Sequence, residues 1–209
     1  MHYLESLVSI EKILMSISKE QFQKIKSKYQ YLSSWAIWAT EGETPKSNIG
    51  DLTVLDPKIN KNLFNELNPE VVFVALNISR GDIKIPLGNF HDSRGVATDF
   101  KIRFAFKDTP FWGGYMTDII KDFEEKISGK VKEYLSKNRE FEKQNVDMFL
   151  EELNDIGAKN PTLVAFGNDV FSILNRHLKD RFKIIKVPHY ANYTNKEKYR
   201  EQVKAICNF

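Results

Sequence analysis

The chain has 209 residues, of which 42% are hydrophobic and 28% charged. This is the composition of a folded globular domain and excludes a disordered or low-complexity chain. The 31 basic and 28 acidic residues leave a net charge of +3, which permits a local basic surface for nucleic acid without requiring one. The single cysteine, Cys207, excludes an intrachain disulfide and a four-cysteine iron–sulfur or zinc site, so we expect no metal and no cofactor.

Neither a membrane segment nor a secretion signal is expected. Apolar runs stay far below the ~20 residues that a membrane helix needs. The first residues include Glu5 and Glu11 and lack a basic leader, so they do not form a signal peptide. We therefore expect a cytoplasmic protein without a membrane partner, and the composition leaves the oligomeric state open.

The first 55 residues are predicted to be mainly helical. Residues 3–17 carry apolar side chains at helical spacing, and residues 19–29 repeat the pattern more weakly. Residues 31–38 are dense in aromatics and favour a strand whose rings are buried. Residues 41–55 contain Gly and Pro and predict a loop. We expect a single domain over 1–209, in which this N-terminal extension packs on a core formed by 56–209.

From residue 57 onward, apolar runs of strand length alternate with helical patterns. The helices expected are 57–67, with Asp56 as N-cap, then 99–106, 145–156, one with Asn168 as N-cap, and 196–206. The charge-rich stretch 121–143 is interpreted as a solvated helix or an insertion. The strands expected are 71–76, 115–120, 162–166 and 184–187. This order predicts an α/β fold with three α/β/α layers and a central, mainly parallel four-stranded sheet.

Polar residues follow two of the predicted strands where each strand ends. Val71–Ala75 is a continuous apolar run that leads to Asn77 and then to a loop. The last predicted strand leads to Pro188 and His189. In open α/β sheets ligands bind beyond the carboxyl ends of the strands, so Asn77 and His189 are expected to face one crevice.

These two strand ends resemble the active-site motifs of the uracil-DNA glycosylase superfamily. Ala75-Leu76-Asn77-Ile78 stands where that family has Gly-hydrophobic-Asn/Asp-Pro, and His189-Tyr190-Ala191 stands where it has His-Pro-Ser. Thr117-Asp118-Ile119-Ile120-Lys121 is similar to a Thr-Asn-hydrophobic-hydrophobic-Lys strand of relatives that carry an iron–sulfur cluster. The chain lacks the Gly and Pro of the first motif and the Pro-Ser of the second, and has Asp118 where the family has Asn. The resemblance covers about residues 70–206.

The resemblance implies a role for each residue. Asn77 would orient the attacking water, because an amide cannot accept a proton as a carboxylate can. His189 would donate a hydrogen bond to the leaving base, and Phe90 would stack on it. Asp118 would read the base edge, and since a carboxylate offers only acceptors, donor-bearing bases would suit it better than uracil. Contacts to the DNA backbone would come from Ser79, Arg80, Asn168 and Tyr190.

The function expected from the resemblance is that of a DNA glycosylase-like protein, which hydrolyses the N-glycosidic bond of a flipped damaged or deaminated base. Two alternatives stay open: a non-catalytic nucleic-acid-binding module on the same fold, and a small-molecule nucleotide-processing α/β enzyme. The same residues also have structural interpretations, since Asn77 is suited to a turn and Phe90 to a core. Asp118 is equally suited to ending a strand, and His91, which matches no family position, is expected to be structural.

Overall fold

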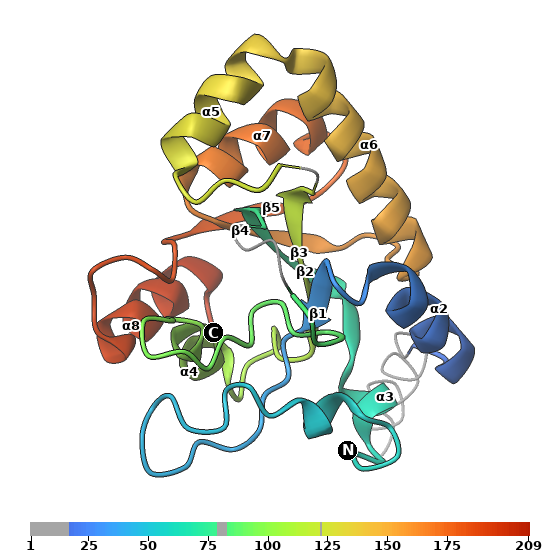
Figure 1. Ribbon diagram of the computed structural model, residues 1–209, viewed down its shortest axis with the longest axis vertical. Coiled ribbons are helices and arrows are strands. Elements are labelled where there is room, and N and C mark those ends of the chain that lie inside the picture. Colours follow the sequence, from blue (N-terminus) through green and yellow to red (C-terminus); the bar gives the residue numbers. More distant parts are fainter. Residues whose placement is uncertain (1–16, 79–82, 122) are drawn as a thin grey trace.

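The computed structural model describes residues 17–78, 83–121 and 123–209, and its centre is a five-stranded mixed sheet (Figure 1). The strand order is β1-β3-β2-β4-β5. Neighbouring strands are parallel except β1, which runs antiparallel to β3. The strands are β1 (Ser33–Trp35), β2 (Asn68–Asn77), β3 (Gly114–Ile120), β4 (Thr162–Phe166) and β5 (Ile184–Val187).

All four predicted strand segments are strands, but the predicted count of four was wrong. The additional strand, β1, lies inside the aromatic segment 31–38 and comes from the part of the chain that was expected to be an extension. It pairs with the edge of β3, where an antiparallel neighbour needs no crossover helix. Residues 1–16, which include nearly all of the predicted helix 3–17, lie outside the described residues.

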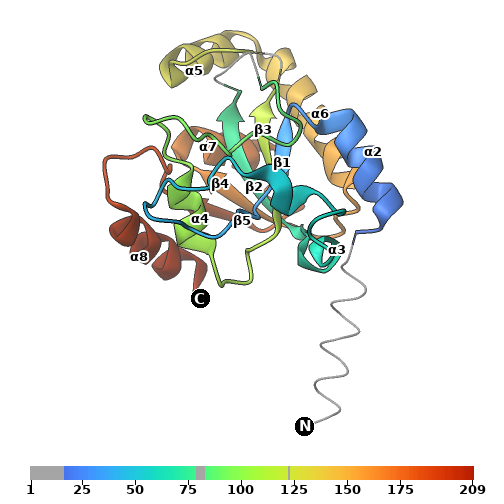
Figure 2. The ribbon, with the colours of Figure 1, turned by 60° about the horizontal axis from the view of Figure 1, so that its bottom comes forward.

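Seven α-helices surround the sheet in the described part of the chain, together with the short 3-10 helix η1 (Leu52–Leu55). They are α2 (Lys19–Tyr29), α3 (Leu63–Glu66), α4 (Phe100–Phe106), α5 (Ser128–Lys137), α6 (Arg139–Asp155), α7 (Asn168–Leu178) and α8 (Lys196–Cys207). Figures 1 and 2 show α6 and α7 over one face of the sheet and α4 and α8 over the other. None of these helices is both long and apolar enough to cross a membrane.

The central strand is apolar on both faces, which explains why helices cover both. Val72 and Val74 of β2 belong to the core shared with α2, α6 and α7, whereas Val71, Phe73 and Ala75 belong to the core shared with α4 and α8. A continuous apolar run is typical of a strand buried on both faces. The alternation along β2 therefore divides the protein into two hydrophobic cores separated by the sheet.

Two predicted helix starts were wrong. Asp56 does not cap a helix: its carboxylate accepts the N–H of Lys58 at 2.8 Å and closes a turn, and α3 begins only at Leu63. Asn168 is the first helical residue of α7 rather than its N-cap, which is Gly167 with φ of 93°. Only glycine adopts that backbone conformation without strain, so the turn from β4 into α7 depends on this glycine.

Candidate functional site

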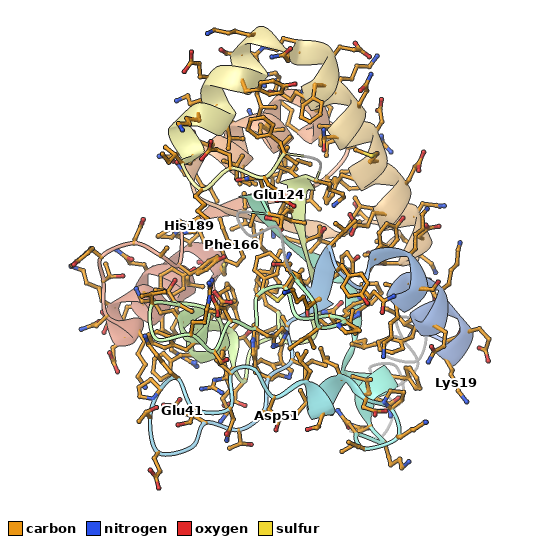
Figure 3. All side chains as sticks on the ribbon, viewed as in Figure 1. Lys19, Glu41, Asp51, Glu124, Phe166 and His189 are labelled. Carbon is orange, nitrogen blue, oxygen red and sulfur yellow. The ribbon has the colours of Figure 1, made fainter. Side chains whose placement is uncertain are left out.

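A crevice of about 780 Å³ lies at the carboxyl ends of β2, β4 and β5, beside β3. Figure 3 shows His189 and Phe166, two of its lining residues, close together beside the sheet. The prediction of a shared crevice is confirmed for Asn77 and His189. All the predicted site residues that the structure describes line it: Asn77, Phe90, Asp118, Asn168, His189 and Tyr190. The other two, Ser79 and Arg80, lie outside the described residues.

Asn77 is the last residue of β2 and is tied to the loop after β3. Its side-chain Nδ2 donates to the carbonyl oxygens of Phe123 at 3.0 Å and Glu125 at 2.8 Å. These two acceptors determine which end of the amide is nitrogen, so the oxygen Oδ1 is directed away from them. Asn77 therefore has a structural role in fixing this loop, and only Oδ1 is left to accept a hydrogen bond from a ligand or a water.

The hydrogen bond and the burial of His189 indicate a neutral ring with one tautomer. Its Nδ1 accepts the backbone N–H of Ala191 at 3.1 Å, and its ring stacks on Tyr190 with centroids 4.5 Å apart. An Nδ1 that accepts a hydrogen bond leaves the proton of the neutral ring on Nε2. Burial lowers the pKa of His189 below its usual value, which favours this neutral form. His189 can thus donate one hydrogen bond from Nε2 without carrying a positive charge.

Aromatic side chains form a second wall of the crevice. Tyr190 packs edge-to-face on Phe166 at 5.1 Å and on Phe90 at 6.5 Å. Phe90 is only 2% exposed and has φ of 64°, a left-handed conformation that is strained for a bulky residue. Its carbonyl accepts the indole N–H of Trp38 at 3.3 Å, which helps to hold that conformation. Phe90 and Phe166, at 2% and 1% exposure, offer almost no ring surface, so burial leaves Phe90 without the stacking role predicted for it, and Tyr190 is the partly exposed ring of the three.

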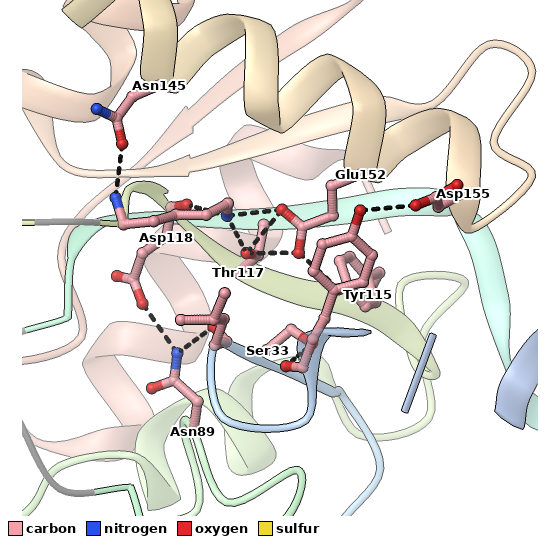
Figure 4. Close-up of polar contacts among 11 residues, drawn as sticks. Ser33, Asn89, Tyr115, Thr117, Asp118, Asn145, Glu152 and Asp155 are labelled. Atoms are coloured by element: carbon pink, nitrogen blue, oxygen red, sulfur yellow. Dashed lines mark hydrogen bonds and ion pairs between the residues drawn. The ribbon is translucent and has the colours of Figure 1, made fainter. Parts of the chain in front are cut away.

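Asp118 lies on β3 at the floor of the crevice, beside Ala75 of β2. Its Oδ2 accepts the side-chain N–H of Asn89 at 2.8 Å (Figure 4). The side-chain nitrogen of Asn89 also donates to the carbonyl of Leu32, and its Oδ1 accepts the N–H of Phe90. Both ends of this amide are engaged, so Asn89 holds the Asp118 carboxylate in one orientation.

Asn89 is a site residue that the sequence motifs did not predict. It lines the crevice, precedes the strained Phe90 and is 7% exposed, which is unusual for an asparagine. Within the sequence, only its position next to Phe90 in Gly88-Asn89-Phe90-His91 pointed toward it. His91 itself is buried and directed to the carbonyl of Ile49, in agreement with the structural role expected for it.

A buried polar network supports β3 from the opposite face. Glu152 of α6 is 0% exposed and accepts hydrogen bonds from the hydroxyls of Tyr115 at 2.6 Å and Thr117 at 3.0 Å. Its other oxygen lies 2.6 Å from Nζ of Lys121, which also donates to the carbonyl of Asp118 (Figure 4). Thr117 and Asp118 point to opposite faces because side chains alternate along a strand. The motif 117–121 thus places Asp118 in the crevice and its neighbours in this network.

The described residues that line the crevice include more carboxylates than basic groups. Among its described lining residues the carboxylates of Asp99, Asp118, Glu125 and Asp169 outnumber the cations Lys126 and Lys186. Two of the carboxylates have basic neighbours on α5, since Glu125 lies 3.6 Å from Lys130 and Asp169 lies 3.8 Å from Lys132. An acidic floor favours ligands that present N–H donors.

Asn168 lies at the first turn of α7, where the backbone N–H groups of a helix start are available to an anion. Its side chain is exposed at the rim of the crevice, where a nucleic-acid backbone could contact it without a clash. In the described part of the chain, His, Cys, Asp and Glu side chains form no group of three or more that could hold a metal ion.

Comparison of the chain with protein-family models, with curated proteins and with solved structures finds no match. The resemblance to uracil-DNA glycosylases is therefore neither supported nor opposed by known relatives. Any functional assignment depends on the geometry of the crevice and on the chemistry of the residues that line it.

Proposed function

We propose that the protein is a DNA glycosylase-like hydrolase on a three-layer α/β/α fold of the uracil-DNA glycosylase kind. It would take a flipped damaged or deaminated base into the crevice and hydrolyse the bond between base and sugar. The observation that carries the proposal is that Asn77 at the end of β2, Asp118 within β3 and His189 just after β5 line one cavity. We also propose that the protein is cytoplasmic and has access to DNA there.

The roles follow from the hydrogen-bonding groups. As the glycosidic bond breaks, negative charge develops on the base, and the Nε2–H of a neutral His189 would stabilise it. Water would attack the sugar carbon while Oδ1 of Asn77 accepts one of its hydrogens and orients it. The attacking water supplies the hydroxyl group of the sugar and the proton of the released base. The partly exposed ring of Tyr190 would pack against the base.

The geometry at Asp118 favours a particular class of base. Uracil presents one N–H between two carbonyl groups, and a carboxylate accepts from the N–H but repels the neighbouring carbonyl oxygens. A base with an exocyclic amino group beside a ring nitrogen offers donors instead. Asn89 holds Asp118 as an acceptor, so amino-bearing bases are the expected substrates and uracil a poor one.

Single-turnover assays of base release test the proposal. The substrates are single- and double-stranded oligonucleotides with uracil, hypoxanthine, xanthine or an amino-bearing modified base at one position, and abasic sites are cleaved with alkali. His189→Ala should slow release by about a hundredfold, the typical cost of losing one preorganised donor. His177→Ala is the matched control, because His177 lies on α7 and does not line the crevice.

The Asp118→Asn variant tests whether Asp118 determines which base is bound rather than the rate of the reaction. An amide restores a donor beside the acceptor, so this variant should gain activity on uracil and lose preference for amino-bearing bases. Asp180→Asn, an exposed position outside the crevice, should change neither. If the wild type releases no base from any substrate and Asp118→Asn gains none, the catalytic proposal fails.

One observation favours a second candidate function, a non-catalytic nucleic-acid-binding module. The two short hydrogen bonds of the Asn77 amide go to loop carbonyls, which is what a purely structural asparagine does. Binding of oligonucleotides without base release, unchanged by His189→Ala, would support this candidate.

A further inference from the structure

A second cavity, of about 570 Å³, lies away from the crevice and shares no lining residue with it. It is enclosed by residues 38–41 after β1, by the second half of α4 with the turn 107–109, and by Arg200 of α8. Figure 3 shows Glu41, which lines this cavity, well apart from His189. A volume of this size matches the ~300–1,000 Å³ of small-molecule sites.

Aromatic rings form the walls of the second cavity. Trp38 and Trp112 are neighbours with ring centroids 5.6 Å apart and planes inclined by 56°. Phe104 also lines the cavity, and its ring is contacted by two cations, with Nζ of Lys196 at 4.0 Å and the guanidinium carbon of Arg200 at 5.6 Å from the ring centroid. Trp38 is 4% exposed and its N–H donates to the carbonyl of Phe90, so this wall is rigidly held. Such walls accommodate planar rings.

Arg103 is the buried cation of the cavity, at 3% exposure. Its two terminal nitrogens donate to the carbonyls of Ala39, Ser47 and Pro45, which fixes the guanidinium. Its Nε is a buried donor without a hydrogen-bond partner among the described residues. A buried donor of this kind is rare and points to an acceptor supplied from outside the chain.

The charges limit how much negative charge a ligand can bring. Arg103, Lys107 and Arg200 line the cavity together with the carboxylates of Glu41 and Asp108, which leaves one positive charge in excess. Nζ of Lys196 lies 3.4 Å from the Glu41 carboxylate and partly neutralises it. Asp108 has φ of 60°, a left-handed conformation that aspartate adopts readily in turns.

We propose that this second cavity binds a nucleoside monophosphate. The base would pack against Trp112, and the single phosphate would be held by Lys107 and by Arg200, whose guanidinium also contacts the Phe104 ring and donates to the Phe104 carbonyl. The two carboxylates disfavour a triphosphate, whose additional charge the cavity cannot balance. The site is independent of the proposed glycosylase activity, because the two cavities share no residue.

Titration of the whole chain with dAMP, followed by tryptophan fluorescence and calorimetry, tests the proposal. Binding should saturate, and dAMP should bind more tightly than deoxyadenosine, inorganic phosphate or dATP. Arg200→Gln should weaken dAMP by about tenfold, the cost of one charge-assisted hydrogen bond. Lys107→Gln changes an exposed side chain that the fold does not need, and should weaken dAMP by about threefold, as expected for one screened charge.

The control variants distinguish binding of dAMP at the second cavity from binding at the crevice. Lys179→Gln removes an exposed cation outside both cavities and should leave the affinity unchanged. The proposal is overturned if dAMP does not saturate, or if neither Arg200→Gln nor Lys107→Gln weakens it. It is equally overturned if His189→Ala abolishes dAMP binding while both cavity variants retain it, since the ligand would then occupy the crevice.

Discussion

The buried pair of Glu152 and Lys121 should make the protein sensitive to the loss of either single charge. Both side chains are buried, at 0% and 5% exposure, and their charged atoms lie 2.6 Å apart. Burial raises the pKa of Tyr115, so its hydroxyl stays protonated and donates to Glu152. Breaking a buried ion pair by removing one partner leaves an uncompensated charge and costs about 3–5 kcal/mol.

Glu152→Gln keeps the shape of the side chain and removes its charge. The amide can still bond to the hydroxyls of Tyr115 and Thr117, but it leaves the buried ammonium of Lys121 without a negative partner. We expect the free energy of unfolding to fall by about 3–5 kcal/mol. Lys121→Met should lose a similar amount, because it leaves Glu152 as the unpaired charge.

Urea unfolding of the two single variants and the double variant measures the coupling. The double variant removes both charges and should lose no more than either single variant, so the coupling energy equals about one single loss. Glu133→Gln, which removes a carboxylate from the exposed pair with Lys137, is the control and should cost at most ~1 kcal/mol. A loss below about 1 kcal/mol for Glu152→Gln, or additive losses in the double variant, would refute the reasoning.

The remaining predictions concern pH, catalysis and salt. Burial lowers the pKa of His91 from 6.5 to about 4, so the unfolded chain gains a proton first as the pH falls. The stability that the neutral His91 contributes is therefore present above pH 6.5 and should drop by about 2 kcal/mol at pH 5 in urea unfolding, a drop that His91→Gln should remove. Because the pKa of His189 is also lowered by burial, single-turnover base release should stay constant as the pH falls from 8 to 6.5; a decline with a midpoint at or above 6.5 would contradict a neutral donor. Asn77→Ala should slow release and Asn65→Ala, at an exposed position of α3, should not. Finally, DNA affinity measured by fluorescence anisotropy should fall with salt, and Lys186→Gln should reduce the slope by about one, whereas an unchanged slope would exclude Lys186 from phosphate contact.

The strands and the edge at which they end could be predicted from the sequence. Continuous apolar runs bounded by Gly, Pro and Asn indicate where β2 and β4 lie, because such runs are typical of strands buried on both faces. β5 is short and only partly buried, with Lys186 exposed. The order of strand and helix then places the carboxyl ends together. For this reason the pattern alone was enough to assign Asn77 and His189 to one edge of the sheet.

Tertiary structure decided which groups form hydrogen bonds with one another and which strands pair. Asn89 holds Asp118 across 29 positions of sequence, and Asn77 binds carbonyls 46 and 48 residues away, contacts that no local pattern encodes. The antiparallel β1 was not expected in the sheet, since a three-residue strand has too little periodicity to reveal its partner. Gly167 replaced Asn168 as the cap because the turn from β4 requires a positive φ, which follows from where β4 and α7 must pack.

The sequence by itself determined which residues end the strands and which chemistry those residues carry. Only the folded chain decided where the polar atoms of each side chain point, into the crevice or toward backbone groups. The physical reason is that a hydrogen bond depends on distances of about 3 Å between atoms, whereas periodicity specifies only the face and the end of an element. Asn77 illustrates both: its position follows from the pattern of β2, and its amide orientation follows from the loop at 123–125.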